Sequence, residues 1–192
     1  YMPWLGKKAY DGIMAAYTAA SRKNGKKYIP LIKNATQLHV IEKGAFCGVV
    51  LDGSYNLTEA NYKTSLQNLV DRVLITDKDG NQIGVVEDTA AQQKYGVVQT
   101  VYKQEDGKDA QTEAKALLQT LEQTGSVTGC PGDSRAVSGY ALIVQETTTG
   151  LFGKFYIESD THTFTDGKHE MALTLAFSNM MDEKEIENQS QG

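Results

Sequence analysis

The sequence predicts an α+β protein built mainly from antiparallel β-sheet, and three observations indicate this class. Residues 132–177 hold four turn signals separated by apolar, β-prone runs, the pattern of an antiparallel meander. Only residues 7–23 and 109–123 combine a clear helical period with a helix-length run. Strands and helices do not alternate in the regular order of a parallel sheet. We therefore expect a barrel-like sheet domain with a C-terminal meander, a few short helices and one longer inserted helix.

The meander is defined best by its last strand, residues 169–177. This run alternates strictly and places on one face the apolar residues Met171, Leu173, Leu175 and Phe177. Strict alternation is typical of a half-buried strand. Asp166-Gly167 precedes the run, and Asp-Gly between two such runs is a strong hairpin signal. We expect this stretch to close the last sheet or barrel of the protein.

The N-terminal part of the chain predicts a small helix-plus-hairpin domain over residues 1–45. Residues 7–23 carry an apolar stripe from Tyr10 to Tyr17, which is typical of a helix with one face on a core. Residues 27–33 and 37–42 then indicate two short strands around a turn.

The second expected domain covers residues 46–178 and is an antiparallel, barrel-like sheet. Its inserted helix, residues 109–123, begins at Asp109, a residue type that caps helix N-termini. Residues 179–192 are polar and acidic without periodicity, and we expect them to form a disordered tail.

A hairpin is predicted around residues 77–81, where the spacing of Asp77, Asp79 and Asn81 also resembles the start of a calcium loop. A full calcium loop needs a bidentate Glu at its twelfth position, and that position here is Asp88. A solvated hairpin turn is the favoured interpretation.

Composition excludes several classes of protein. The 192 residues carry a net charge of −5 without a basic stripe, so we expect no nucleic-acid binding. No apolar run approaches the length of a membrane span, and the N-terminus lacks the pattern of a signal peptide. Cys47 and Cys130 are far apart in the sequence, and we expect two reduced structural thiols in a protein made in the cytoplasm.

The histidines are the first candidates for chemistry. His162 and His169 flank the last hairpin, with Asp160 and Glu170 near them in the sequence, so a metal pair or an acid–base pair is conceivable. The favoured interpretation is a set of polar residues on the solvent face of the hairpin. His39 has no partner at metal-ligand spacing.

A cysteine nucleophile is the second candidate. Cys130 precedes Pro131-Gly132 in a turn-like context, which permits a nucleophile only weakly. The serine-elbow, phosphate-loop, dinucleotide, H-E-x-x-H and C-x-x-C motifs are absent from the sequence. The sequence therefore gives no positive case for a catalytic, cofactor-binding or metal-binding residue.

Five stretches, in this order and spacing, resemble one known family. They are residues 65–73, residues 92–96, the Ala-rich helix 109–121, Gly132-Asp133 with Arg135 and Gly139, and residues 153–163. Together they resemble the XkdQ/YqbQ family of tail proteins from phages and phage-like elements such as PBSX, over roughly residues 5–178. Family members carry a further N-terminal domain, so we expect this chain to be a C-terminal fragment.

The resemblance implies a structural role. Proteins of this kind are similar to the baseplate hubs of contractile-tailed phages, so the expected assembly is a homotrimer in the virion tail. The expected partners are the tail tube or a tube adaptor above and the central spike below. The alternative is a cell-wall hydrolase using Cys130 or the His162/His169 pair, or a cell-wall-binding module with tyrosines and Trp4 as stacking platforms.

Overall fold

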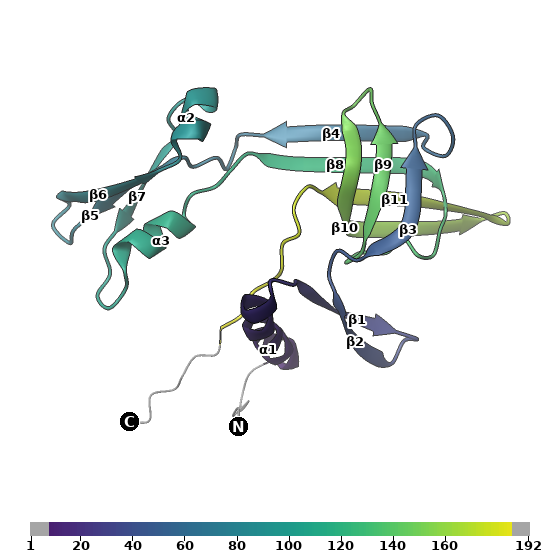
Figure 1. Ribbon diagram of the computed structural model, residues 1–192, viewed down its shortest axis with the longest axis horizontal. Helices are drawn as coiled ribbons and strands as arrows, with labels where there is room; N and C mark the ends of the chain where they lie inside the picture. Colours follow the sequence, from purple (N-terminus) through teal and green to yellow (C-terminus); the bar gives the residue numbers. More distant parts are fainter. Residues whose placement is uncertain (1–7, 186–192) are drawn as a thin grey trace. The chain divides into compact units, whose positions relative to one another are not determined.

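The computed structural model describes residues 8–185 (Figure 1). The chain divides into two compact units, one made of residues 1–62 with 124–192 and the other of residues 63–123. The smaller unit is one continuous insertion between strands β4 (Glu59–Ser65) and β8 (Glu122–Pro131). Strands predominate and the helices are short, so the predicted α+β class is confirmed.

The larger unit contains a six-stranded sheet in the order β3-β9-β10-β11-β8-β4. The further strands of this sheet are β3 (Phe46–Asp52), β9 (Ala141–Glu146), β10 (Leu151–Thr165) and β11 (Lys168–Ala176). Strands β9, β10 and β11 are consecutive antiparallel neighbours, so the predicted C-terminal meander is confirmed. Strand β3 pairs with β9 in parallel, which makes the sheet mixed.

The sheet expected to be barrel-like is open, because the order of its strands is linear. Among residues 8–185, β3 and β4 each have one hydrogen-bonded neighbour and form the two edges. Irregularities between Ile157 and Ser159 in β10, and between Val127 and Cys130 in β8, bend the strands instead. The result is an open sheet that folds round its own core.

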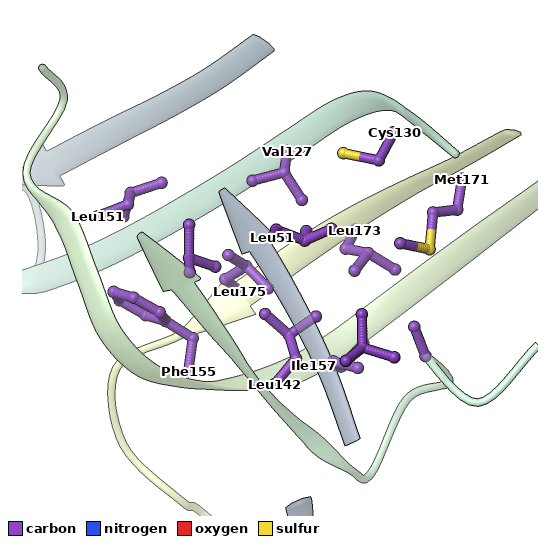
Figure 2. Packing of buried hydrophobic residues seen from close by; sticks show 13 residues of the cluster. Leu51, Val127, Cys130, Leu142, Leu151, Phe155, Ile157, Met171, Leu173 and Leu175 are labelled. Atoms are coloured by element: carbon purple, nitrogen blue, oxygen red, sulfur yellow. The ribbon is translucent and has the colours of Figure 1, made fainter. Parts of the chain in front are cut away.

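The core of the larger unit lies between the strands of this sheet. Figure 2 shows its side chains gathered there, among them Leu51, Leu142, Leu151, Ile157 and Leu175, each at most 1% exposed. These residues come from four strands, so the apolar faces predicted by alternation converge on one interior. Burial of such side chains is the main source of stability of the unit.

The N-terminal part forms the predicted helix and hairpin within the larger unit. Helix α1 (Ala9–Asn24) ends at Gly25, whose φ of 72° is left-handed and suits glycine. Strands β1 (Tyr28–Lys33) and β2 (Gln37–Glu42) pair antiparallel. The rings of Tyr17 and Tyr28, 4.9 Å apart, join the helix to the hairpin.

The start of the expected disordered tail is instead held against α1 and the hairpin. Asn179 Nδ2 donates to the Lys43 carbonyl at 2.8 Å, and the Lys184 amide donates to Thr18 Oγ1 at 3.1 Å. Met181 is buried. Residues in the first part of the expected tail, 179–185, thus have defined contacts with the rest of the larger unit; residues 186–192 lie outside the described range.

The smaller unit is a three-stranded sheet with two short helices. Its strands follow the order β6-β5-β7, with β5–β6 antiparallel and β5–β7 parallel. Its elements are β5 (Arg72–Thr76), β6 (Gln82–Glu87), α2 (Thr89–Tyr95), β7 (Gln99–Lys103) and α3 (Ala110–Ala116). Its buried core consists of Val73, Ile75 and Ala114.

The predicted inserted helix, residues 109–123, is too long. Asp109 caps α3 as expected, since its Oδ1 accepts from the Thr112 amide at 2.8 Å. The helix ends at Ala116 because Gln119 instead forms a β-bridge with Val70, through hydrogen bonds of 2.9 and 3.0 Å. Residues from Glu122 onward already belong to β8.

Candidate functional site

The two histidines of the last hairpin meet on β10 and β11. His162 Nδ1 lies 2.8 Å from His169 Nε2. The turn between the strands sets this contact, since Asp166 and Gly167 have φ values of 50° and 75°, as a two-residue hairpin turn with both φ positive requires. This turn pairs Phe164 with His169 and His162 with Met171.

The histidines lie on the core side of the hairpin, so their placement on the solvent face is wrong. Only 15% of the His162 side chain is exposed. His169 shares a face with the buried residues Met171 and Leu173 because side chains alternate along a strand. Glu170 lies on the opposite, exposed face and takes no part in the contact.

The segment Gly132–Gly139, which connects β8 to β9, lies against the histidine pair. His162 Nε2 donates to the Ala136 carbonyl at 3.1 Å, and the Gly132 amide donates to the His169 carbonyl at 2.7 Å. A Cβ at Gly132 would overlap the His169 ring, so glycine allows this close approach. The ring of Phe164 also packs against His169 and stacks on its ring, with the two centroids 4.0 Å apart.

Two carboxylates, those of Asp160 and Asp133, lie near the histidine pair. Asp160 Oδ2 lies 3.6 Å from His162 Nε2, while Asp160 Oδ1 accepts from the Ser138 amide at 2.6 Å. Asp133 is paired with Arg135 at 2.6 Å. Hydrogen bonds from Arg135, with a smaller contribution from the charge of His169, lower the pKa of Asp133 to about 2. We call Asp160, His162 and His169 the histidine cluster.

The cysteines offer no nucleophile to this cluster. Both are free, so the prediction of unpaired thiols is confirmed. Cys130 is buried, its Sγ is 3.7 Å from the Thr128 carbonyl, and burial raises the pKa of its thiol. Cys47 is half-buried, and burial is also the main cause of the raised pKa of its thiol. A thiol held protonated in this way is a poor nucleophile.

The remaining candidates are His39, Trp4 and the turn of residues 77–81. His39 is exposed on β2, and Trp4 lies outside the described residues. In the turn of residues 77–81, Asp77 Oδ1 accepts from the amides of Asp79 and Asn81, so this carboxylate is used by the turn itself. Within residues 8–185 no group of three or more potential metal ligands occurs.

Exposed apolar side chains form a second feature of the larger unit. Ile32 and Leu38, which face each other across the β1–β2 hairpin, are 72% and 56% exposed. Phe46 and Val50 on the edge strand β3 are also exposed. Unpaired edges and exposed apolar residues are typical of surfaces that pack against another chain.

The sequence did not identify three groups that lie near the histidines: Asp133, Arg135 and the Ala136 carbonyl. No local motif places residues 132–139 over the hairpin, because this contact spans more than twenty residues. The inward direction of His169, in contrast, follows from extending the alternation of Met171 and Leu173 by one step.

Comparison with known proteins agrees with this fold. Over 145 residues the chain is 26% identical to the phage-like element PBSX protein XkdQ of Bacillus subtilis (strain 168), covering 70% of this chain and 44% of that protein. Among solved structures, the 43 kDa tail protein of prophage MuSo2 from Shewanella oneidensis matches 89% of this chain and 53% of its own length, with a TM-score of 0.59 and 13% identity. A tail protein from Neisseria meningitidis MC58 has a TM-score of 0.49 at 14% identity, over 85% of this chain and 54% of that one.

The chain thus spans about half the length of these relatives. No helix among residues 8–185 is long and apolar enough to cross a membrane. A family model described as YQBQ-like matches residues 4–176, which is nearly the whole chain. The chain therefore belongs to the YQBQ-like family.

Proposed function

We propose that the chain is a structural, non-enzymatic component of the tail of a phage or phage-like element. The observation that carries this proposal is the YQBQ-like match over residues 4–176. It is supported by the similarity to XkdQ and by a fold shared with a prophage tail protein at a TM-score of 0.59. The exposed Ile32 and Leu38 and the free edge of β3 are suitable for assembly rather than for turnover of a substrate.

Within the tail, the proposed position is the baseplate hub, as a homotrimer between the tail tube or its adaptor and the central spike. A ring of identical subunits needs two different surfaces on each chain, because each subunit contacts its neighbours head to tail. The two sheet edges, β3 and β4, are different surfaces of this kind within the larger unit. Synthesis in the bacterial cytoplasm followed by incorporation into the virion tail completes the proposal.

Electron microscopy of purified tails tests the position. Tails carrying an epitope tag in the exposed 77–81 turn, decorated with antibody, are expected to show label at the distal end of the tube. Label along the tube, or no label on purified tails, would contradict the hub. Light scattering over a concentration series separately tests whether the chain forms a trimer, and a strict monomer of the full-length protein would contradict the homotrimer.

A cell-wall hydrolase remains the alternative, because His162 and His169 do meet. Release of soluble peptidoglycan fragments by the chain, and its loss in His162→Ala and His169→Ala with His39→Ala unaffected, would favour the hydrolase. Absence of release by the parent chain and by the assembled tail supports the structural role.

A further inference from the structure

The hydrogens of the histidine cluster can be assigned from its partners. The Ala136 carbonyl can only accept, so His162 Nε2 carries a hydrogen and donates it at 3.1 Å. In a neutral His162 the other nitrogen, Nδ1, then has no hydrogen and must accept. Its partner at 2.8 Å, His169 Nε2, must therefore be a donor. One hydrogen lies between the two rings.

The distance between the two facing nitrogens suits a shared hydrogen better than a metal ion between the rings. The ring centroids are 5.0 Å apart and the facing nitrogens 2.8 Å apart, so each nitrogen lies close to the line that joins the two centres. This is the straight arrangement of an N–H···N hydrogen bond. A metal ion needs about 2.0–2.1 Å to each imidazole nitrogen, and the gap on that line is too short to hold one.

We infer that His162 and His169 form a proton-controlled clamp on the segment Gly132–Gly139, which is closed while one hydrogen lies between the rings and opens when both rings become cationic. The first added proton can enter at His169 Nδ1 and leave the contact between the rings intact. The second must enter at His162 Nδ1, the last nitrogen without a hydrogen. Two N–H groups would then face each other at 2.8 Å, and the rings must separate.

The charges around the pair favour the uptake of the first proton. Asp160 on β10, and Asp133 on the covering segment, favour a positive charge on the pair, so the first proton is accommodated. Arg135 is paired with Asp133, and Glu170 of β11 faces away. Two imidazoles in contact take up protons in two separate steps that belong to the pair. Opening accompanies the second step, at lower pH than the first.

Opening of the clamp affects contacts beyond the histidines, along the segment Gly132–Gly139. When His162 moves, the Ala136 carbonyl loses its donor, and the bond from the Ser138 amide to Asp160 lies next to it. The far end of the segment reaches the connection between β2 and β3, since the Gly139 carbonyl accepts from the Gly44 amide at 2.7 Å. Gly139 also packs against Ile29 so closely that a Cβ there would lie 2.9 Å from Ile29 Cγ2.

Nitrogen NMR of the imidazoles from about pH 8 to about pH 4.5, combined with amide hydrogen exchange, tests the clamp. Histidine normally changes charge between about pH 5 and 8. We expect His162 and His169 to take up their protons in two separated steps. Exchange at Ser138, relative to its intrinsic rate, should rise at least about tenfold with the second step, as a local opening does.

The variant His169→Gln isolates the role of the proton. Its amide can donate to His162 Nδ1, takes up no proton and can turn its oxygen toward His162 when that ring becomes cationic. We expect the rise of exchange at Ser138 on acidification to be lost in this variant and retained in His39→Gln. A rise that survives in His169→Gln would overturn the inference. So would ordinary, independent titration of both histidines in the parent chain, which decides the matter if the variant does not fold.

Discussion

The two compact units of this chain are stabilised by different means. The larger unit encloses a continuous apolar core between the strands of its six-stranded sheet, including Leu142, Ile157 and Leu175. The buried cluster of the smaller unit is smaller: Val73, Ile75 and Ala114 are buried, and only partly buried apolar side chains pack against them. Because hydrophobic stabilisation scales with the apolar area removed from water, the larger unit should be much the more resistant to opening.

Polar contacts compensate in part for the small core of residues 63–123. Asp71, which is 1% exposed, is the centre of these contacts. Its Oδ1 accepts from the Val98 amide at 2.9 Å, and its carbonyl accepts from the Asp88 amide at 2.8 Å. One buried aspartate thereby joins β5, the start of α2 and the loop before β7. The comparison indicates that a unit with little apolar burial depends on a few hydrogen bonds, each with a large effect.

The largest effect is expected from a cavity in the larger core. Leu175→Ala should reduce the free energy of unfolding of that unit by about 2–5 kcal/mol, because it removes a fully buried side chain. Urea unfolding followed by amide exchange in β9, β10 and β11 measures the loss. Phe152→Ala, at a position 63% exposed, serves as the control and should change stability little. A loss below about 1 kcal/mol in Leu175→Ala would show that this core is not the main source of stability.

Asp71→Ala should have the next largest effect, and only in the smaller unit. Removal of the carboxylate leaves the Val98 amide without its acceptor, at a cost of about 1–3 kcal/mol. We expect faster amide exchange in β5 and β7 with exchange in β10 unchanged. The exposed Asp79→Ala is the matched control. Equal acceleration in both units would mean that they open together and that the comparison between them fails.

The sequence predicts hairpins better than it predicts the order of a sheet, because alternation and turn residues are local signals. The run from Met171 to Leu175 identifies the buried face of β11, and Asp166-Gly167 identifies the turn before it, so the antiparallel meander is correct. The hairpin around residues 77–81 of the smaller unit is correct for the same reason. The parallel pairing of β3 with β9 joins segments about ninety residues apart and has no local signal. The sheet order, and hence the open barrel, could not be read from the pattern.

The predictions that failed share one cause: contacts with residues distant in the sequence override the local pattern. The periodic run of residues 109–123 favours a helix throughout, yet Gln119 forms a β-bridge with Val70. The histidine cluster likewise depends on the segment Gly132–Gly139, which no motif places over the hairpin. The inward direction of His169 was within reach of the sequence, because it continues the alternation of Met171 and Leu173. That of His162 was not, because the irregularity between Ile157 and Ser159 reverses the alternation of its strand.

A smaller effect is expected at the N-terminus of α2, a helix without buried residues. Asp88 Oδ1 accepts from the Ala90 and Ala91 amides at 3.1 and 3.0 Å, and Asp88→Ala should cost about 0.5–2 kcal/mol. Amide exchange within α2 measures the loss. Asp88→Asn keeps an acceptor and should retain most of the stability. If Asp88→Ala leaves α2 protected, packing rather than the cap maintains this helix.

The smallest effect is a pH dependence confined to the larger unit. The pKa of Asp133 is lowered to about 2, chiefly by hydrogen bonds from Arg135, against an ordinary value of about 4. A lowered pKa means that the ion pair contributes fully above about pH 4 and is lost as the pH falls toward 2. The contribution should be below about 1 kcal/mol, since Arg135 is largely exposed. Arg135→Gln should raise the pKa of Asp133, which carbon NMR of its carboxyl group measures. It should also weaken the fall in the stability of the larger unit at low pH, while the pH dependence of the stability of residues 63–123 stays unchanged. An unchanged Asp133 titration in Arg135→Gln would assign the shift to the backbone amides of the segment instead.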